Sequence, residues 1–154
     1  MKRIFVFCVL SFAIAACNKD KVESTPHLKF KSYNTDVVPY NGSLRAILEF
    51  TDQEGDLDSV FVTRKRLNQN DATSSYFEFP LKGTVPEFGS QNRGELQLNL
   101  QVAYDVAFNL SPIAIPNTDP TQYEVDTLQI RFYVKDKAGH TSDTAVAKPL
   151  YVIR

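Results

Sequence analysis

Hydrophobic and polar residues alternate along most of the chain beyond residue 27. The clearest run extends from Glu95 to Val102, where Leu96, Leu98 and Leu100 alternate with polar residues. A period of two places successive side chains on opposite faces of a strand, so the pattern predicts strands with one buried and one solvated face. On this basis we expect seven strands, over residues 28–33, 44–51, 58–66, 75–82, 94–104, 123–135 and 144–153.

The spacing of these strands indicates the fold class. Short one-faced strands joined by turn-rich segments, without an amphipathic helix, are typical of two antiparallel sheets packed face to face. We therefore expect an all-β chain, with an immunoglobulin-like antiparallel β-sandwich over residues 27–154. The chain contains no tryptophan, so it lacks the core tryptophan of antibody domains. A small closed barrel is the alternative architecture.

One long connection, over residues 105–121, interrupts the alternation. It carries apolar residues but also three prolines, which prevent a regular hydrogen-bond ladder. A long apolar loop is either a contact site for a partner or a cover for a sheet edge, and both interpretations remain open. The candidate contact residues are Phe108, Leu110, Ile113 and Ile115.

The first seventeen residues form a separate segment. Lys2 and Arg3 precede an apolar stretch that starts at Ile4, and small residues follow up to Ala16, which are the parts of a secretory signal. The apolar stretch is too short for a membrane-spanning helix of about 20 residues. Together with Cys17, its end resembles the lipobox of bacterial lipoproteins. The resemblance implies a signal peptide over residues 1–16, an acyl chain such as palmitate on Cys17, and a polar tether over residues 17–26.

Charge and cysteine content narrow the function classes. Removal of residues 1–16 leaves 138 residues with 15 basic and 18 acidic side chains, a net charge of −3. Cys8 lies in the signal and Cys17 would carry lipid, so the domain has no disulfide. The only basic run, residues 64–66, is too short for a nucleic-acid footprint, and we interpret it as a solvated strand end.

Two loops carry the candidate metal ligands. Four acids occur within seven residues, and Gly55 among them permits a tight turn. In a sandwich, this loop and the loop after residue 135 meet at one end, which brings further acids near. Clustered carboxylates suit calcium, whereas surface ion pairs with Lys135 and Lys137 are the competing interpretation. The candidate ligands are Asp52, Glu54, Asp56, Asp58 and Asp136, with Asp143 also near.

The same loops carry a family resemblance. Residues 52–56 have the form Asp-x-x-Gly-Asp, and residues 136–142 have the form Asp-x-x-Gly-x-x-Ser. With the lipobox, the chain resembles exported lipoproteins of Gram-negative bacteria that carry one immunoglobulin-like or PKD-like domain. The resemblance implies a sandwich fold and a cell envelope location, most readily the outer membrane on its periplasmic side or at the cell surface. Many such proteins have no assigned activity.

Catalytic patterns are missing from the sequence. His140, Ser142 and Asp143 are neighbours in one loop and cannot adopt the geometry of a catalytic triad. The chain has no zinc pattern, phosphate-binding glycine loop or nucleophile elbow. We therefore expect a lipid-anchored, non-enzymatic binding or accessory module. The alternatives are a carbohydrate-binding module of a glycan-uptake system and an assembly subunit that docks through residues 105–121.

Overall fold

The computed structural model describes residues 24–68, 80–87, 89, 91–119 and 121–154. This part of the chain forms nine strands and one turn of π-helix, η1. In chain order they are β1 (His27–Tyr33), β2 (Val37–Pro39), β3 (Ser43–Thr51), β4 (Leu57–Arg66), β5 (Leu81–Thr84), β6 (Arg93–Gln101), η1 (Val102–Val106), β7 (Asp126–Asp136), β8 (Ala145–Val146) and β9 (Leu150–Ile153).

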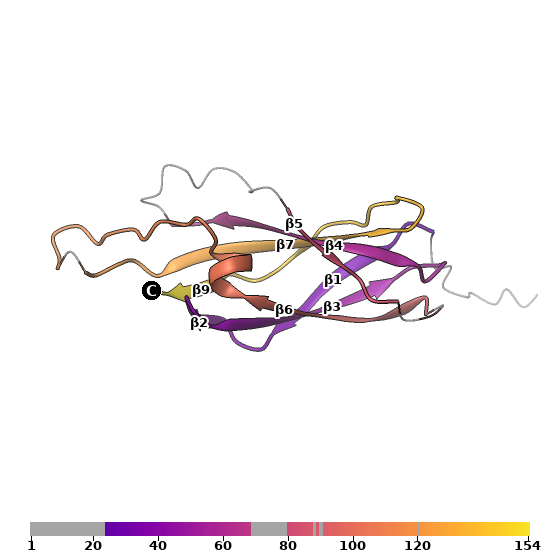
Figure 1. Cartoon of the computed structure of the whole chain (residues 1–154), viewed down its shortest axis with the longest axis horizontal. Coiled ribbons are helices and arrows are strands. Elements are labelled where there is room, and N and C mark those ends of the chain that lie inside the picture. The colour runs from indigo at the N-terminus through magenta and orange to yellow at the C-terminus, as the bar shows by residue number, and fades with distance from the viewer. Residues whose placement is uncertain (1–23, 69–79, 88, 90, 120) are drawn as a thin grey trace, which may run out of the picture.

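The strands form two sheets that pack face to face (Figure 1). One sheet has the order β1-β3-β6, and the other has the order β2-β9-β7-β4-β5, with β8 also paired to β7. Neighbouring strands are antiparallel except β2, which runs parallel to β9. No pairing among the described strands joins the two sheets. The all-β prediction is therefore confirmed as a two-layer sandwich, and the closed barrel is not what forms.

The core lies between the sheets and follows the alternation of the sequence. Every second residue of β7 is buried along its whole length, and β3 alternates in the same way. Leu48 of one sheet and Phe132 of the other are fully buried. Each such side chain contributes about 1.5–3 kcal/mol by leaving water. Leu98 is only half-buried because its strand, β6, is paired on one edge alone within the described part of the chain.

Three strand boundaries differ from the prediction. The strand expected over residues 94–104 ends at Gln101, where η1 begins, although Val102 still points into the core. The strand expected over residues 144–153 is divided into β8 and β9, since Pro149 has no N–H to donate to a ladder. The strand expected over residues 123–135 starts at Asp126 instead.

Two further elements, β5 and β2, also differ from the prediction. Residues 75–79 of the strand predicted over residues 75–82 lie outside the described residues, and the neighbouring strand observed is β5. Strand β2 was not predicted, because its three residues precede a turn closed by the Gly42 N–H, which donates to the Pro39 carbonyl at 2.8 Å. These differences are why the described residues form nine strands and not seven.

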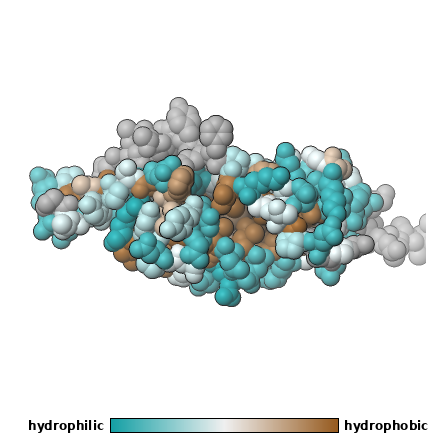
Figure 2. All heavy atoms as spheres, viewed as in Figure 1, coloured by the Kyte–Doolittle hydropathy of each residue, from teal (hydrophilic) through white to brown (hydrophobic). Residues whose placement is uncertain are grey.

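Strands β5 and β6 are not paired with each other in the described part of the chain. A groove of about 460 Å³ runs between them, and its floor includes the buried residues Val60, Val62, Leu96 and Leu100. Figure 2 shows the corresponding apolar surface in the middle of the face, bordered by polar side chains. The groove exposes part of the core between the two edge strands.

Candidate cation site

Three acids, two from the β3–β4 loop and one from the end of β7, meet at one end of the sandwich. Asp52 directly follows β3, Asp56 directly precedes β4, and Asp136 is the last residue of β7. Leu57 pairs with Asp136 in the β4–β7 ladder, which brings the loop before β4 beside the end of β7. One carboxylate oxygen from each acid lies within 4.8 Å of the other two. We call Asp52, Asp56 and Asp136 the acidic cluster.

Backbone turns hold the acidic cluster in place. Gly55 has a φ of 66°, a conformation that suits glycine, and the next N–H, from Asp56, donates to Asp52 Oδ2 at 2.9 Å. The Lys137 N–H donates to the Asp56 carbonyl at 3.1 Å, which joins the two loops. The geometry is therefore set by the main chain of both loops.

Asp52 is the most deeply buried member of the acidic cluster. Its side chain is buried, with 0% of the residue exposed. Burial raises the pKa of the Asp52 carboxyl above 3.8, aided by the nearby charges of Asp56, Glu54 and Asp136, although the hydrogen bond from the Asp56 N–H acts against this. Oδ1 of Asp52 and Oδ1 of Asp56 are buried and accept no hydrogen bond from any described residue. Two such oxygens beside a third carboxylate are suited to binding a cation.

Asp136 is oriented by the loop that follows it. The His140 N–H donates to Asp136 Oδ1 at 2.8 Å, and His140 Nδ1 lies 2.7 Å from Asp136 Oδ2. A ligand carboxylate is often held in this way by donors outside the metal's own coordination shell. His140 itself is half exposed, with 50% of its side chain accessible. The loop thus fixes the direction of the Asp136 carboxylate.

The remaining predicted ligands lie elsewhere. Glu54 and Asp58 are exposed and outside the acidic cluster, and Asp58 accepts a hydrogen bond from the Ser59 hydroxyl. Asp143 instead accepts the Leu28 N–H at 2.8 Å. The structure therefore brings together three of the five principal candidates.

The predicted competition from lysines is not what the structure shows. Lys137 Nζ lies 3.1 Å from Glu87 Oε1, and this partner raises the pKa of the Lys137 ammonium. Lys135 Nζ lies 5.7 Å from the centre of the Phe61 ring. Neither ammonium forms an ion pair with the acidic cluster among the described residues, although the charge of Asp56 also acts on Lys137.

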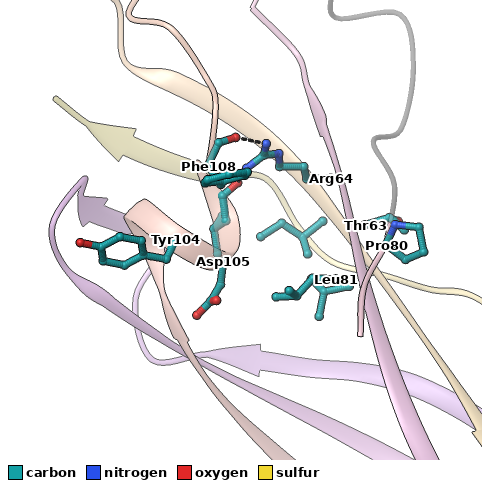
Figure 3. Close-up of a pocket in the computed structure, with 10 residues that line it drawn as sticks. Thr63, Arg64, Pro80, Leu81, Tyr104, Asp105 and Phe108 are labelled. Carbon is teal, nitrogen blue, oxygen red and sulfur yellow. Dashed lines mark hydrogen bonds between the residues drawn. The ribbon is translucent and has the colours of Figure 1, made fainter. Parts of the chain in front are cut away.

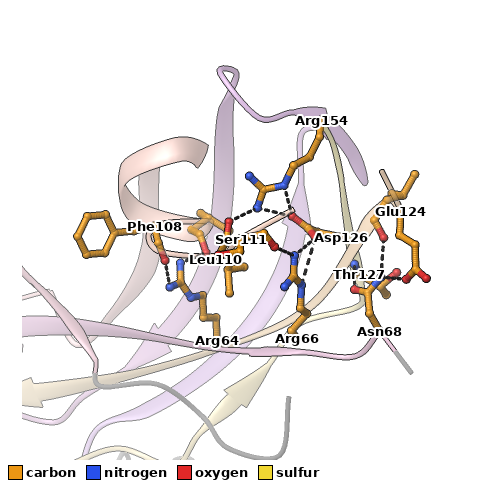
Figure 4. Close-up of polar contacts among 12 residues, drawn as sticks. Arg64, Arg66, Asn68, Phe108, Leu110, Ser111, Glu124, Asp126, Thr127 and Arg154 are labelled. Carbon is orange, nitrogen blue, oxygen red and sulfur yellow. Dashed lines mark hydrogen bonds and ion pairs between the residues drawn. The ribbon is translucent and has the colours of Figure 1, made fainter. Parts of the chain in front are cut away.

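A second polar cluster lies at the opposite end of the sandwich and was not predicted (Figure 4). Arg66 and Arg154 both pair with Asp126, whose side chain is fully buried. Arg66 Nε lies 3.1 Å from Asp126 Oδ1, and Arg154 Nε lies 2.8 Å from Asp126 Oδ2. The interpretation of residues 64–66 as a solvated strand end is wrong, because Arg64 and Arg66 are 7% and 6% exposed.

These arginines also hold the segment after η1. Arg64 donates to the carbonyls of Val106 and Phe108, and Arg66 donates to the Ser111 carbonyl at 2.8 Å. The signal for this arrangement was present in the sequence. Alternation through Val60 and Val62 continues inward to Arg64 and Arg66, so the periodicity of the strand predicts their burial and their charge does not.

The apolar loop over residues 105–121 is only partly exposed. Phe108 is 53% exposed and Ile115 is 37% exposed. Leu110 packs against the core, and Ile113 is half-buried. The Ile113 carbonyl also accepts the Glu124 N–H at 2.8 Å, which ties the loop to the segment before β7. Two of the four predicted contact residues are thus available to a partner.

Comparisons with known proteins add little to this picture. No protein-family model matches the chain, and no curated protein matches its sequence. No helix in the described ranges is both long and apolar enough to cross a membrane.

Solved structures resemble the chain only weakly. The sporulation control protein Spo0M from Bacillus subtilis has a TM-score of 0.41 and 8% identity, and the match covers 84% of this chain and 50% of that protein. A β-glucosidase from Listeria innocua has a TM-score of 0.41 and 11% identity, over 82% of this chain and 16% of that enzyme. One from Kluyveromyces marxianus has a TM-score of 0.37 and 10% identity, over 84% and 15%. This chain spans half or less of each, and similarities of this size support no assignment.

Proposed function

We propose that this chain is a lipid-anchored, non-enzymatic module of the Gram-negative cell envelope, stabilised by one calcium ion. The observation that carries the calcium part is the acidic cluster, in particular the buried Oδ1 atoms of Asp52 and Asp56 that lack a hydrogen-bond donor among the described residues. The anchor part rests on the lipobox-like residues that end at Cys17. Residues 1–23 lie outside the described part of the chain.

We assign the sandwich to the immunoglobulin-like class, and the strand pairing supports this. The sheet β1-β3-β6 matches an A-B-E order, and β9-β7-β4-β5 matches G-F-C-C′. The loops before β4 and after β7 then correspond to the B–C and F–G loops, which meet at one end of such domains. Strand D of that fold has no counterpart among the described strands.

Calcium is the favoured cation for chemical reasons. All three side chains of the acidic cluster supply hard oxygen atoms, and no cysteine or zinc-type pattern is present in the domain. The Asp56 and Asp136 carboxylates repel Asp52 unless a cation is bound between them. A divalent ion removes this repulsion in the folded state only, so it stabilises the fold by mass action.

Thermal melting tests the calcium proposal. Full-length protein in detergent is stripped with a chelator and melted in 0 to roughly 10 mM calcium, because extracellular calcium modules bind at about 10⁻⁴–10⁻³ M. We expect melting to rise, by about 2.7 kcal/mol of stability at a hundredfold excess over Kd. Asp56→Asn/Asp136→Asn should abolish the response. Glu54→Gln/Asp58→Asn removes the same charge outside the acidic cluster and should keep it.

Two results would contradict the proposal. A flat response of the wild-type protein would leave three acids in solvated turns as the remaining interpretation. Equal loss of the response in both double variants would show that total loop charge acts on stability, without a defined site. Magnesium serves as a further comparison, since it demands a tighter octahedral shell than these loops are expected to provide.

A further inference from the structure

A second hollow lies beside η1, at the end of the sandwich opposite the acidic cluster. It has a volume of about 650 Å³, which is in the range of small-molecule sites. Its walls come from four separate parts of the chain: the turn after β2, η1, the segment that follows η1, and Arg154, which follows β9. We call it the Tyr104 hollow, and its lining includes Tyr40, Asn41, Tyr104, Phe108, Asn109 and Arg154.

Aromatic rings are unusually exposed here. Tyr104 is 76% exposed and Phe108 is 53% exposed. Figure 3 shows Tyr104 leaving η1 in a different direction from Asp105. The π-helical turn has five residues where β6 would otherwise continue its alternation, and it places Tyr104 outside while Val102 and Val106 are buried. Single π-helical turns are frequent at functional sites.

Polar groups in the hollow are free to bind a ligand. The side-chain amides of Asn41 and Asn109 form no hydrogen bond within the described part of the chain. Asn109 has a φ of 58°, so its backbone is held in a conformation that is uncommon for residues other than glycine. Each amide offers both a donor and an acceptor.

The hollow carries almost no unbalanced charge. Arg154 is its one charged lining residue, and that guanidinium is paired with Asp126, lies over the Tyr40 ring at 4.6 Å and donates to the Leu110 carbonyl at 2.6 Å. Asp105 is turned toward β6, where its carboxylate accepts the Gln101 N–H at 2.6 Å. A ligand that fits this chemistry is uncharged.

The walls are also rigid. Arg64 holds the carbonyl of Phe108, as Figure 3 shows, and Arg66 and Arg154 hold the next carbonyls of the same segment. The exposed rings therefore stand on a backbone that is fixed before any ligand arrives. Such preorganisation lowers the entropy lost on binding.

We propose that the Tyr104 hollow binds a neutral saccharide. The C–H face of a sugar ring stacks on Tyr104 and Phe108, where the ring faces carry partial negative charge. The sugar hydroxyls exchange hydrogen bonds with the amides of Asn41 and Asn109. This inference rests on the proposed binding role of the domain, but it requires neither calcium nor the lipid anchor.

A glycan array with full-length protein in detergent tests the inference. The array carries neutral gluco-, galacto-, manno- and xylo-oligosaccharides, together with uronic acid-containing chains. We expect binding to at least one neutral series. For the bound oligosaccharide, Tyr104→Ala and Phe108→Ala should each weaken affinity by about tenfold, whereas Tyr104→Phe should bind nearly as well as the wild type. Asn109→Gly keeps the backbone conformation, removes the amide and should also weaken binding.

Tyr151→Ala is the matched control, because Tyr151 is 42% exposed on β9 and lies outside the hollow. Absence of binding to every neutral series, binding to uronic acid chains alone, or full affinity of Tyr104→Ala would each overturn the inference. Melting temperatures equal to the wild type exclude misfolding of the variants. Calcium response and membrane association, measured on the same preparations, separate a failure here from a failure of the proposed function.

Discussion

Among single residues, Asp52 shows how a buried acid couples protonation to folding. Its carboxylate is removed from water, and only one of its oxygens accepts a hydrogen bond among the described residues. A buried acceptor without a donor lowers stability by about 1–3 kcal/mol. Such a carboxylate is tolerated where a bound cation or a proton neutralises its charge. In the absence of a cation, the proton is the alternative, which is why the pKa of Asp52 is raised.

The pH dependence of stability without calcium follows from this shift. Because the folded-state pKa of Asp52 lies above 3.8, the stability that its protonated form contributes is fully present below about pH 3.8 and is lost as pH rises through the folded-state pKa. The Asp52→Asn variant has no carboxyl at this position, so its stability does not fall with pH in this way. In chelator, we expect the variant to be more stable than the wild type by about 1–3 kcal/mol at pH 7, and the advantage to shrink toward pH 3.

Denaturant unfolding at several pH values measures this difference. Asp58→Asn is the control, since Asp58 is exposed and lies outside the acidic cluster. A variant that is less stable than the wild type at pH 7 without calcium would contradict the argument. So would a difference that does not change with pH.

Between elements, one long-range contact is electrostatic. Asp126 at the start of β7 pairs with Arg66 at the end of β4 and with Arg154 after β9. The same arginines hold carbonyls of the segment after η1. One carboxylate therefore links two neighbours of β7 in the sheet and, through them, positions the wall of the Tyr104 hollow.

Loss of this carboxylate should be strongly destabilising. Asp126→Asn removes the buried carboxylate that Arg66 and Arg154 share, and breaking a buried pair in this way costs about 3–5 kcal/mol. Asp36→Asn breaks the exposed pair between Lys148 and Asp36 and should cost less than about 1 kcal/mol. Urea unfolding of both variants checks the contrast. Equal, small losses would mean that the buried cluster adds no stability.

Alternation alone predicted most of the elements. The runs that became β3, β6 and β7 were evident because one face of each strand is buried. It did not locate β2, since three residues are too few to show a period. It also did not predict η1, because Val102 and Val106 are buried and Val102 continues the apolar pattern of β6. Backbone hydrogen bonding, which periodicity does not report, decides such cases.

The candidate site was predictable only at the level of loops. Strand order predicted that the loops around Asp52 and Asp136 meet, and they do. Which acids point inward depends on the turn at Gly55, whose positive φ directs Asp56 into the cluster while Glu54 stays in solvent. The Tyr104 hollow gave no local signal, since Tyr40 and Tyr104 are 64 positions apart in the chain.

For the molecule as a whole, the proposed lipid anchor on Cys17 can be tested directly. We expect Cys17→Ala to abolish palmitate labelling and to release the protein or leave it as a precursor, because each acyl CH₂ contributes about 0.8 kcal/mol to membrane binding. Cys8→Ala changes the other cysteine, which lies within the signal, and should label normally. Palmitate labelling followed by membrane fractionation measures both. Labelling of Cys17→Ala at the wild-type level would refute the anchor.

The end at which the chain enters the domain determines which end of an anchored molecule would lie nearer the membrane. His27 at the start of β1 pairs with Thr51, beside Asp52, whereas Gln101 and η1 lie at the far end of the same sheet (Figure 1). Eleven residues of β7 separate the two ends by roughly 36 Å. A lipid on Cys17 would thus hold the acidic cluster toward the headgroups, where anionic lipids attract cations. The Tyr104 hollow would face outward, one sandwich length from the bilayer.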